Sequence, residues 1–280
     1  MSRIDEALKV WERVSGSVVA EVDATEPDRL LPFREYESER PASLPLVPQV
    51  PPPVRTVQPT RAVAMPAIRP HDADLQARLV TGNMNPASVE QYRKLAAALH
   101  DWQVETQAKT VMITSALPRE GRTLTVVNLA LTLSESYARR VLVIDADLRA
   151  PALHTTLDIP NDRGLSEALR DGHPALCYTE VSSRLSALSA GKPDSSPLTG
   201  LTSSRMSEIL EECASYFDWV LIDTPPVGML PDAQRLARLV GGILLVIGAR
   251  STPAAAVAKA VAEFGGPEAI VGTVLNRVEV

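Results

Sequence analysis

The sequence predicts an α/β fold, a doubly wound and mostly parallel sheet with helices on both faces. Short apolar runs predict six strands, at 111–113, 141–144, 185–188, 219–222, 243–247 and 270–275. Most of these runs lack polar alternation, which is typical of parallel strands that are buried on both faces. The segments between them carry apolar residues at helical spacing, and strands that alternate with helices indicate βα units.

The expected helices fill the intervals between these strands. Asn85 followed by Pro86 is a good start for a helix that reaches about residue 103. Shorter helices are predicted over 164–169 and 253–264, and Ser203 is expected to cap a helix with one apolar face. The pattern contains no internal repeat, so the folded part is expected to be one α/β unit.

Length, charge and hydropathy exclude several classes of protein. At 280 residues the chain has room for about two domains at most. A net charge of −6 gives no electrostatic footprint for DNA or RNA, so no nucleic-acid partner is expected. The sequence has no apolar run long enough for a membrane span and no apolar segment near its amino terminus, so we expect a cytoplasmic protein.

The first 84 residues differ in composition from the rest. Residues 1–16 have the pattern of a short amphipathic helix, which is marginal alone and needs a partner or the main domain to cover its apolar face. Residues 17–84 include a dense series of prolines and are expected to form a largely disordered linker. The folded domain is therefore predicted over 85–280.

A loop that resembles a phosphate-binding loop follows the first predicted strand. The pattern G-x-x-x-x-G-K-[ST] aligns with residues 116–123, with Ala116 at the first glycine and Arg122 at the lysine. Such a loop presents backbone N–H groups to phosphates, assisted by the amino end of the helix that follows. The expected nucleotide contacts in this segment are Pro118, Arg119, Glu120, Gly121, Arg122, Thr123 and Leu124.

Carboxylates end two of the predicted strands. Asp145 and Asp223 follow apolar runs, and with the hydroxyl of Thr123 they form an oxygen set suited to Mg²⁺. Asp147 is then available to orient or deprotonate an attacking hydroxyl, and Arg149 to neutralise charge on a transferred phosphoryl group. The residues expected to take part in catalysis are Asp145, Asp147, Arg122 and Arg149.

From residue 90 onward the chain resembles the bacterial tyrosine kinases of capsule and exopolysaccharide synthesis, in their separate cytoplasmic form. The motifs are TSALPREGRT at 114–123 as Walker A, VLVIDADLRAPALH at 141–154 as Walker A′ and VLIDTPP at 220–226 as Walker B. GTVLNRV at 272–278 matches the last strand of the family, which adds Asn276 to the expected nucleotide contacts.

The resemblance implies a P-loop nucleotide-binding fold, similar to that of ParA and MinD ATPases, that binds ATP and Mg²⁺. It also implies tyrosine autophosphorylation between subunits of a ring, other protein-tyrosine substrates, and control of polysaccharide export. The implied partner is a membrane-embedded polysaccharide copolymerase that regulates chain length. Such a partner would hold this chain at the inner face of the membrane.

Three positions depart from the family's pattern. Arg122 replaces the P-loop lysine, and a planar guanidinium does not act as the same point charge. The oligomerisation motif E-x-x-R-x-x-R is present as Glu90 and Arg93 but has Ala96 in the last place. The family's tyrosine-rich tail has no counterpart up to Val280, and Tyr36 is the one tyrosine in a segment expected to be flexible.

Two alternatives to an active kinase remain, one suggested by these departures and one by the shared fold. The first is a nucleotide-binding regulator of polysaccharide assembly with weak catalysis, which the change at Arg122 favours. The second is a ParA/MinD-like ATPase, although the signature lysine of such proteins would fall at Leu117.

Overall fold

A computed structural model describes residues 78–81, 84–170, 176–193, 198–227 and 231–277. The predicted helix at 1–16 and most of the predicted linker lie outside the described residues. Within the described part, no helix is both long enough and apolar enough to cross a membrane.

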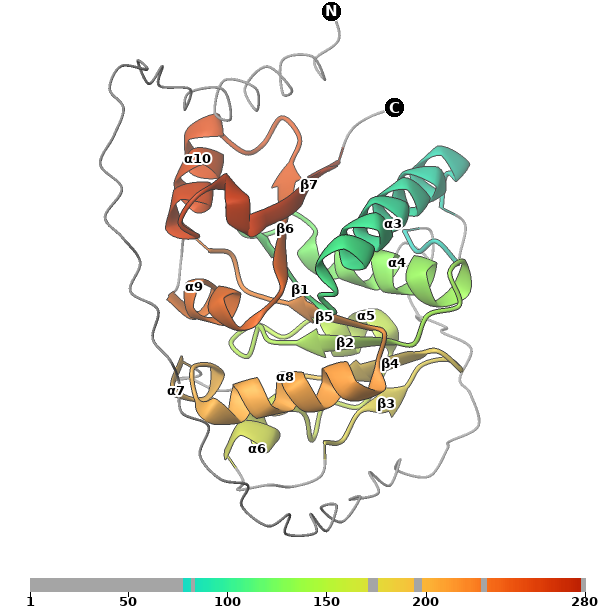
Figure 1. Cartoon of the computed structure of the whole chain (residues 1–280), viewed down its shortest axis with the longest axis vertical. Coiled ribbons are helices and arrows are strands. Elements are labelled where there is room, and N and C mark those ends of the chain that lie inside the picture. Colours follow the sequence, from blue (N-terminus) through green and yellow to red (C-terminus); the bar gives the residue numbers. More distant parts are fainter. Residues whose placement is uncertain (1–77, 82–83, 171–175, 194–197, 228–230, 278–280) are drawn as a thin grey trace, which may run out of the picture. The chain divides into compact units, whose positions relative to one another are not determined.

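One seven-stranded sheet organises the described domain (Figure 1), in the order β3-β4-β2-β5-β1-β6-β7. All neighbouring strands are parallel except the antiparallel pair β3 and β4. The strands are β1 Thr110–Ser115, β2 Val141–Asp145, β3 Thr179–Glu180, β4 Leu185–Leu188, β5 Trp219–Asp223, β6 Gly242–Gly248 and β7 Ile270–Asn276. The mostly parallel sheet was predicted, whereas the short strand β3 was not.

Helices cover both faces of the sheet, as predicted. They are α3 Pro86–Thr106, α4 Arg122–Glu135, α5 Leu153–Leu157, α6 Leu165–Arg170, α7 Leu198–Leu201, α8 Ser204–Tyr216, α9 Pro231–Leu236 and α10 Ala254–Glu263, with 3₁₀ turns at Ala237–Leu239 and Pro267–Ala269. Val111 and Ile113 of β1 pack in one core cluster with α3, α4 and α5. Met112, between them, packs in the opposite cluster with α6 and α8, because side chains alternate along a strand.

Helix α3 begins as predicted and ends later. The Asn85 side chain accepts a hydrogen bond from the backbone N–H of Ala87 at 2.9 Å and so caps the helix. The helix continues to Thr106, three residues beyond the predicted end, and stops where Gln107 adopts a left-handed conformation. No glycine or proline marks this stop, so the sequence offered no signal for it.

The folded domain begins earlier than the predicted boundary at residue 85. Leu79 is only 2% exposed and belongs to the core that packs against α3 and α4. The Asn128 side chain of α4 accepts a hydrogen bond from the Val80 N–H and donates one to the Arg78 carbonyl, both at 2.9 Å. Residues 78–80 therefore belong to the domain, and the predicted linker is too long at its carboxyl end.

Removing the Leu79 side chain tests this boundary. Leu79→Ala should lower the free energy of unfolding by about 2–5 kcal/mol, because it leaves a cavity in the core. Urea denaturation of the full chain measures the change. The control is Val104→Ala, at a side chain that is 58% exposed, which should change the free energy by less than about 0.5 kcal/mol. Equal midpoints for Leu79→Ala and the native chain would show that residues 78–80 do not stabilise the domain.

Candidate active site

The predicted motifs meet where β1, β2 and β5 end. These three strands are neighbours in the order β2-β5-β1, and Asp145 of β2 lies in register with Asp223 of β5. Asp223 in turn lies in register with Ile113 of β1, three residues before the phosphate-binding loop. Ligands in open α/β sheets bind beyond the carboxyl ends of the strands, so this edge is the candidate active site.

Gly121 gives the phosphate-binding loop its shape. It has a φ of 90°, and a Cβ there would lie 2.0 Å from Nδ2 of Asn276. Both the backbone conformation and the space require glycine. Gly121 is also the N-cap of α4, where no side chain makes a capping hydrogen bond. The first N–H groups of α4 are therefore uncapped by side chains, which suits them to bind an anion.

Glu120 braces this loop from inside the protein. Its side chain is buried, and Oε2 accepts a hydrogen bond from the Leu117 N–H at 2.7 Å. Oε1 accepts from the Gly248 N–H at 2.9 Å and from the hydroxyl of Thr252. Glu120 is one of the residues predicted to contact nucleotide, and the structure directs its side chain toward the end of β6.

Asn276 also holds the loop. Its Nδ2 donates to the Glu120 carbonyl at 2.8 Å, and its Oδ1 accepts from the Arg277 N–H at 2.9 Å. Both ends of this side chain are thus engaged by the protein. In this structure Asn276 shapes the loop, a role that the motif match did not suggest.

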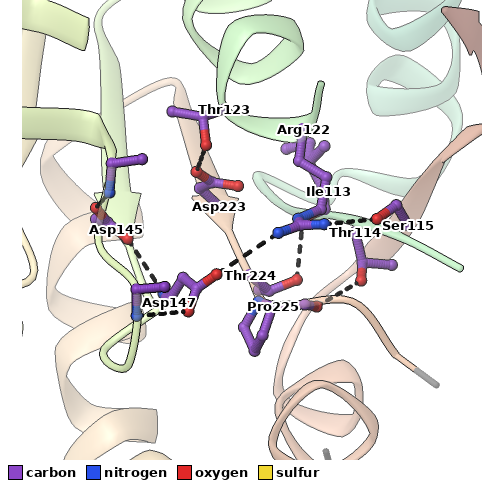
Figure 2. Close-up of polar contacts among 12 residues, drawn as sticks. Ile113, Thr114, Ser115, Arg122, Thr123, Asp145, Asp147, Asp223, Thr224 and Pro225 are labelled. Carbon is purple, nitrogen blue, oxygen red and sulfur yellow. Dashed lines mark hydrogen bonds and ion pairs between the residues drawn. The ribbon is translucent and has the colours of Figure 1, made fainter. Parts of the chain in front are cut away.

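Arg122 lies between the phosphate-binding loop and the loop after β2 (Figure 2). Its Nη1 donates to Ser115 Oγ at 2.7 Å and lies 3.4 Å from the Leu117 carbonyl, while Nη2 is 3.6 Å from Asp147 Oδ2. The Nε atom is buried and has no hydrogen-bond partner within the described residues. A buried donor without an acceptor is costly, and a phosphate oxygen would satisfy it.

The two strand-ending acids are buried and differ in their partners. Asp145 accepts N–H hydrogen bonds from Asp147 at 3.1 Å, Ala152 at 3.1 Å and Leu153 at 3.0 Å, and so fixes the loop after β2. Asp223 accepts a hydrogen bond from the hydroxyl of Thr123 at 2.6 Å. The hydroxyl and the carboxylate predicted to hold a metal are therefore already in contact.

Burial shifts the pKa of both acids upward. Burial and the neighbouring Asp223 carboxylate raise the pKa of Asp145 to about 8. Burial also raises the pKa of Asp223, to about 6, although the hydrogen bond from Thr123 and the charge of Arg122 act in the opposite direction. A cation bound here would lower both pKa values, because it favours the ionised carboxylates.

The oxygen set fits Mg²⁺ in its chemistry. Thr123, Asp145 and Asp223 offer a hydroxyl and two carboxylates, the hard oxygen ligands that Mg²⁺ prefers. No group of three or more His, Cys, Asp or Glu in the described residues is arranged as a closed metal site. Mg²⁺ commonly takes one or two carboxylates from the protein and completes its shell with phosphates and water.

Other predicted site residues lie at the edge of this arrangement. Pro118, Arg119 and Arg149 are exposed, the first two at the tip of the phosphate-binding loop and the third in the loop after β2. Leu124 packs its side chain against the core, so only its backbone N–H remains for a ligand. The structure brings Arg122, Thr123, Asp145, Asp147 and Asp223 together at one edge of the sheet.

Four contributors to the site were not predicted. Ser115 and Leu117 contact Arg122, and Gly248 and Thr252 contact Glu120. Ser115 is polar at the end of an apolar strand, which was a visible signal. Gly248 ends β6 and Thr252 follows that strand at the same sheet edge, but Glu120, which both contact, is more than a hundred residues away in the sequence.

The fold and the loop together define a P-loop nucleotide-binding protein, and comparisons with known proteins refine this class. Tyrosine-protein kinase YwqD of Bacillus subtilis is 34% identical over 198 residues, which are 69% of this chain and 83% of that protein. Tyrosine-protein kinase etk of Escherichia coli K12 is 34% identical over 170 residues, 60% of this chain but 23% of that protein. No family model matches the chain.

Solved structures agree with these relatives. The kinase domain of Escherichia coli tyrosine kinase ETK superimposes with a TM-score of 0.62 at 31% identity, covering 69% of this chain and 78% of that structure. The cell-division ATPase MinD of Pyrococcus furiosus gives a TM-score of 0.52 at 21% identity over 61% of this chain and 72% of that structure, and so shares the fold alone. The chain belongs to the family of bacterial protein-tyrosine kinases.

The raised pKa values predict how pH affects stability without metal. A carboxyl group whose pKa rises on folding binds its proton more tightly in the native state, so the native protein holds more protons than the unfolded chain between about pH 4 and pH 8. The free energy of unfolding in EDTA should therefore fall as pH rises from about 6 to about 8. Denaturant titration at each pH measures it.

Two further measurements test whether these carboxyl groups cause the pH dependence of the free energy of unfolding. Asp145→Asn should flatten the pH dependence, because Asn does not titrate. Added Mg²⁺ should stabilise the native chain more at pH 8 than at pH 6, since it binds the ionised carboxylates. If the free energy of unfolding of Asp145→Asn falls with pH as steeply as that of the native chain, Asp145 is not the group responsible.

Proposed function

We propose that the protein is an ATP-dependent protein-tyrosine kinase that regulates exopolysaccharide or capsule biosynthesis and export. The observation that carries the proposal is Asp147 beside Arg122 and next to the Thr123–Asp223 pair, at the uncapped amino end of α4. This arrangement supplies a base, a cation and metal ligands within one edge of the sheet. Membership of the tyrosine kinase family selects tyrosine as the acceptor.

Each site residue has its own role in the proposed phosphoryl transfer. The N–H groups at the start of α4 and the guanidinium of Arg122 bind the phosphates of ATP. Asp147 accepts the proton of the attacking tyrosine hydroxyl and keeps its oxygen in line with the γ-phosphorus. Mg²⁺, held by Thr123, Asp223 and Asp145 directly or through water, would neutralise charge on the phosphates. Arg149, which is exposed in the loop after β2, would stabilise the transferred group.

A second candidate function is a nucleotide-binding regulator with weak catalysis. The observation that favours it is the contact of Arg122 with Ser115, Leu117 and Asp147, which directs the guanidinium away from a purely phosphate-facing role. An arginine held in this way does not place its charge where a P-loop lysine would. A displacement of about 1 Å can cost about a hundredfold in rate.

Incubation of the full chain with Mg·ATP, followed by phosphotyrosine mapping by mass spectrometry, tests the kinase. The native protein should carry phosphotyrosine, and Asp147→Asn should lower it by at least about a hundredfold because it removes the base without changing the side-chain shape. Arg122→Lys should retain phosphotyrosine and nucleotide binding. Absence of phosphotyrosine from both the native chain and Arg122→Lys, with nucleotide still bound, would establish the regulator instead.

We also propose a membrane-embedded polysaccharide copolymerase as partner, which would place the chain at the inner face of the membrane. A homo-oligomer is a further proposal, with α3 as its contact surface. Glu90 and Arg93 form an exposed ion pair of 3.5 Å on that helix. Ala96 is fully buried, so the arginine that the family carries there would not fit the packing seen here.

Deletion of residues 1–14 tests the partner proposal, because the amphipathic pattern there needs an apolar surface to cover it. The truncated chain should no longer co-purify with the copolymerase, while its affinity for ADP should equal that of the full chain. An intact pull-down after the deletion would reject this segment as the docking element.

A further inference from the structure

Ser115 is a fully buried hydroxyl residue at the end of β1, directly before the phosphate-binding loop. The strand ladder pairs it with Val246 of β6 on one side. On the other side its carbonyl accepts a hydrogen bond of 2.9 Å from the Val227 N–H, in the segment after β5. The backbone that carries this hydroxyl is therefore held from both sides, and the hydroxyl has a fixed position.

The orientation of the Ser115 hydroxyl is also fixed. Its proton is donated to the Leu117 carbonyl at 2.7 Å, so the lone pairs of Oγ are left to accept. Leu117 is itself held, because its N–H donates to Oε2 of Glu120 at 2.7 Å. The acceptor side of Ser115 Oγ is thus set by the loop and does not depend on Arg122.

Arg122 uses this fixed acceptor (Figure 2). Its Nη1 donates to Ser115 Oγ at 2.7 Å, whereas its Nη2 lies 3.6 Å from Asp147 Oδ2. The shorter contact is the stronger one, and a hydrogen bond from a charged donor is stronger than one between neutral groups. Ser115 therefore does more than Asp147 to set the direction of the guanidinium plane.

The contact with Ser115 occupies one corner of the guanidinium and leaves an edge for a ligand. In arginine the Nε hydrogen lies on the same side as Nη2 and on the side opposite to Nη1. The Nε atom of Arg122 is buried and has no hydrogen-bond partner within the residues that the structure describes. The edge formed by Nε and Nη2 has the two parallel donors that bind phosphate in a bidentate manner.

Arginine needs such an orienting contact more than lysine does. Its donors lie in one plane, so a rotated guanidinium no longer directs the edge of Nε and Nη2 toward a phosphate. The ammonium of lysine is a compact charge with three rotatable donors, so its attraction to a phosphate depends little on orientation. A contact that fixes the side chain before the ligand arrives lowers the entropy lost on binding.

We propose that Ser115 is a positioning residue that enables an arginine at position 122 to bind nucleotide phosphates. Ser115 holds Nη1, and the edge of Nε and Nη2 then meets the phosphates. The proposal rests on the nucleotide binding within the proposed function and does not require phosphoryl transfer. The competing explanation is that Ser115 only shapes the loop through the Leu117 carbonyl, which would affect nucleotide binding equally with arginine or lysine at 122.

A double-mutant cycle on the full chain separates these explanations. Isothermal titration calorimetry with ADP measures the Kd of the native chain, Ser115→Ala, Arg122→Lys and the double variant. Ser115→Ala should raise the Kd by about tenfold in the native background, because it removes a hydrogen bond to a charged group. In the chain that also carries Arg122→Lys, the same change should raise the Kd by less than about twofold.

The matched control is Thr114→Val, which removes the neighbouring buried hydroxyl. The Thr114 hydroxyl donates to the Pro225 carbonyl at 2.9 Å and is not among the contacts of Arg122 within the described residues. Its effect on the Kd for ADP should be the same in both backgrounds. Urea denaturation without nucleotide checks that each variant folds. Ser115→Cys, which has a weak acceptor in place of the hydroxyl, replaces Ser115→Ala in the cycle if the alanine variant does not fold.

Equal losses of ADP affinity in the two backgrounds would overturn the proposal and assign Ser115 to the shape of the loop. An unchanged Kd in Ser115→Ala would overturn it as well. If the cycle shows the expected coupling and the native chain carries no phosphotyrosine, the proposal stands and only the kinase function fails. A native chain that does not bind ADP would overturn both.

Discussion

The buried carboxylates Asp145 and Asp223, in register on adjacent parallel strands, are the constraint on which the site depends. Two negative charges cannot be buried together without compensation. Three backbone N–H groups at Asp145, the hydroxyl of Thr123 at Asp223 and the nearby charge of Arg122 provide it in part. The remaining imbalance appears as raised pKa values, and a divalent cation would remove it.

This constraint explains why a cation is retained at position 122. Arginine is always charged at physiological pH and spreads its donors over a plane, so it can satisfy several acceptors at once. Here it contacts Ser115, the Leu117 carbonyl and Asp147, and its buried Nε has no hydrogen-bond partner in the described part of the chain. Lysine would present a compact charge with fewer directional demands. Arginine at this position therefore keeps the positive charge beside the buried carboxylates but contacts the phosphates with a different geometry.

The features that the sequence predicted are local ones. Apolar runs ending in Asp145 and Asp223 and the glycine at 121 could be recognised from a few consecutive residues. Leu79 packs in the core, and Ser115 contacts Arg122. Neither contact could be predicted without knowing which segments of the chain meet.

The internal roles of Glu120 and Asn276 were also hidden, because their partners are distant in the chain. The Glu120 side chain bonds residues 128 and 132 positions away, and its carbonyl bonds one 156 positions away. A motif match identified the correct neighbourhood, yet it could not separate a side chain that meets a ligand from one that braces the loop.

The brace around Glu120 has a consequence for synthesis of the chain. A loop near residue 120 receives hydrogen bonds from Gly248, Thr252 and Asn276, so its native shape is unsupported until β6 and β7 have joined the sheet. Contacts of such sequence separation form late, since the chain must first pay the entropy of closing a long loop. During synthesis, the whole P-loop motif would therefore leave the ribosome well before the chain can bind nucleotide. Binding would begin only after β6 and β7 have also emerged.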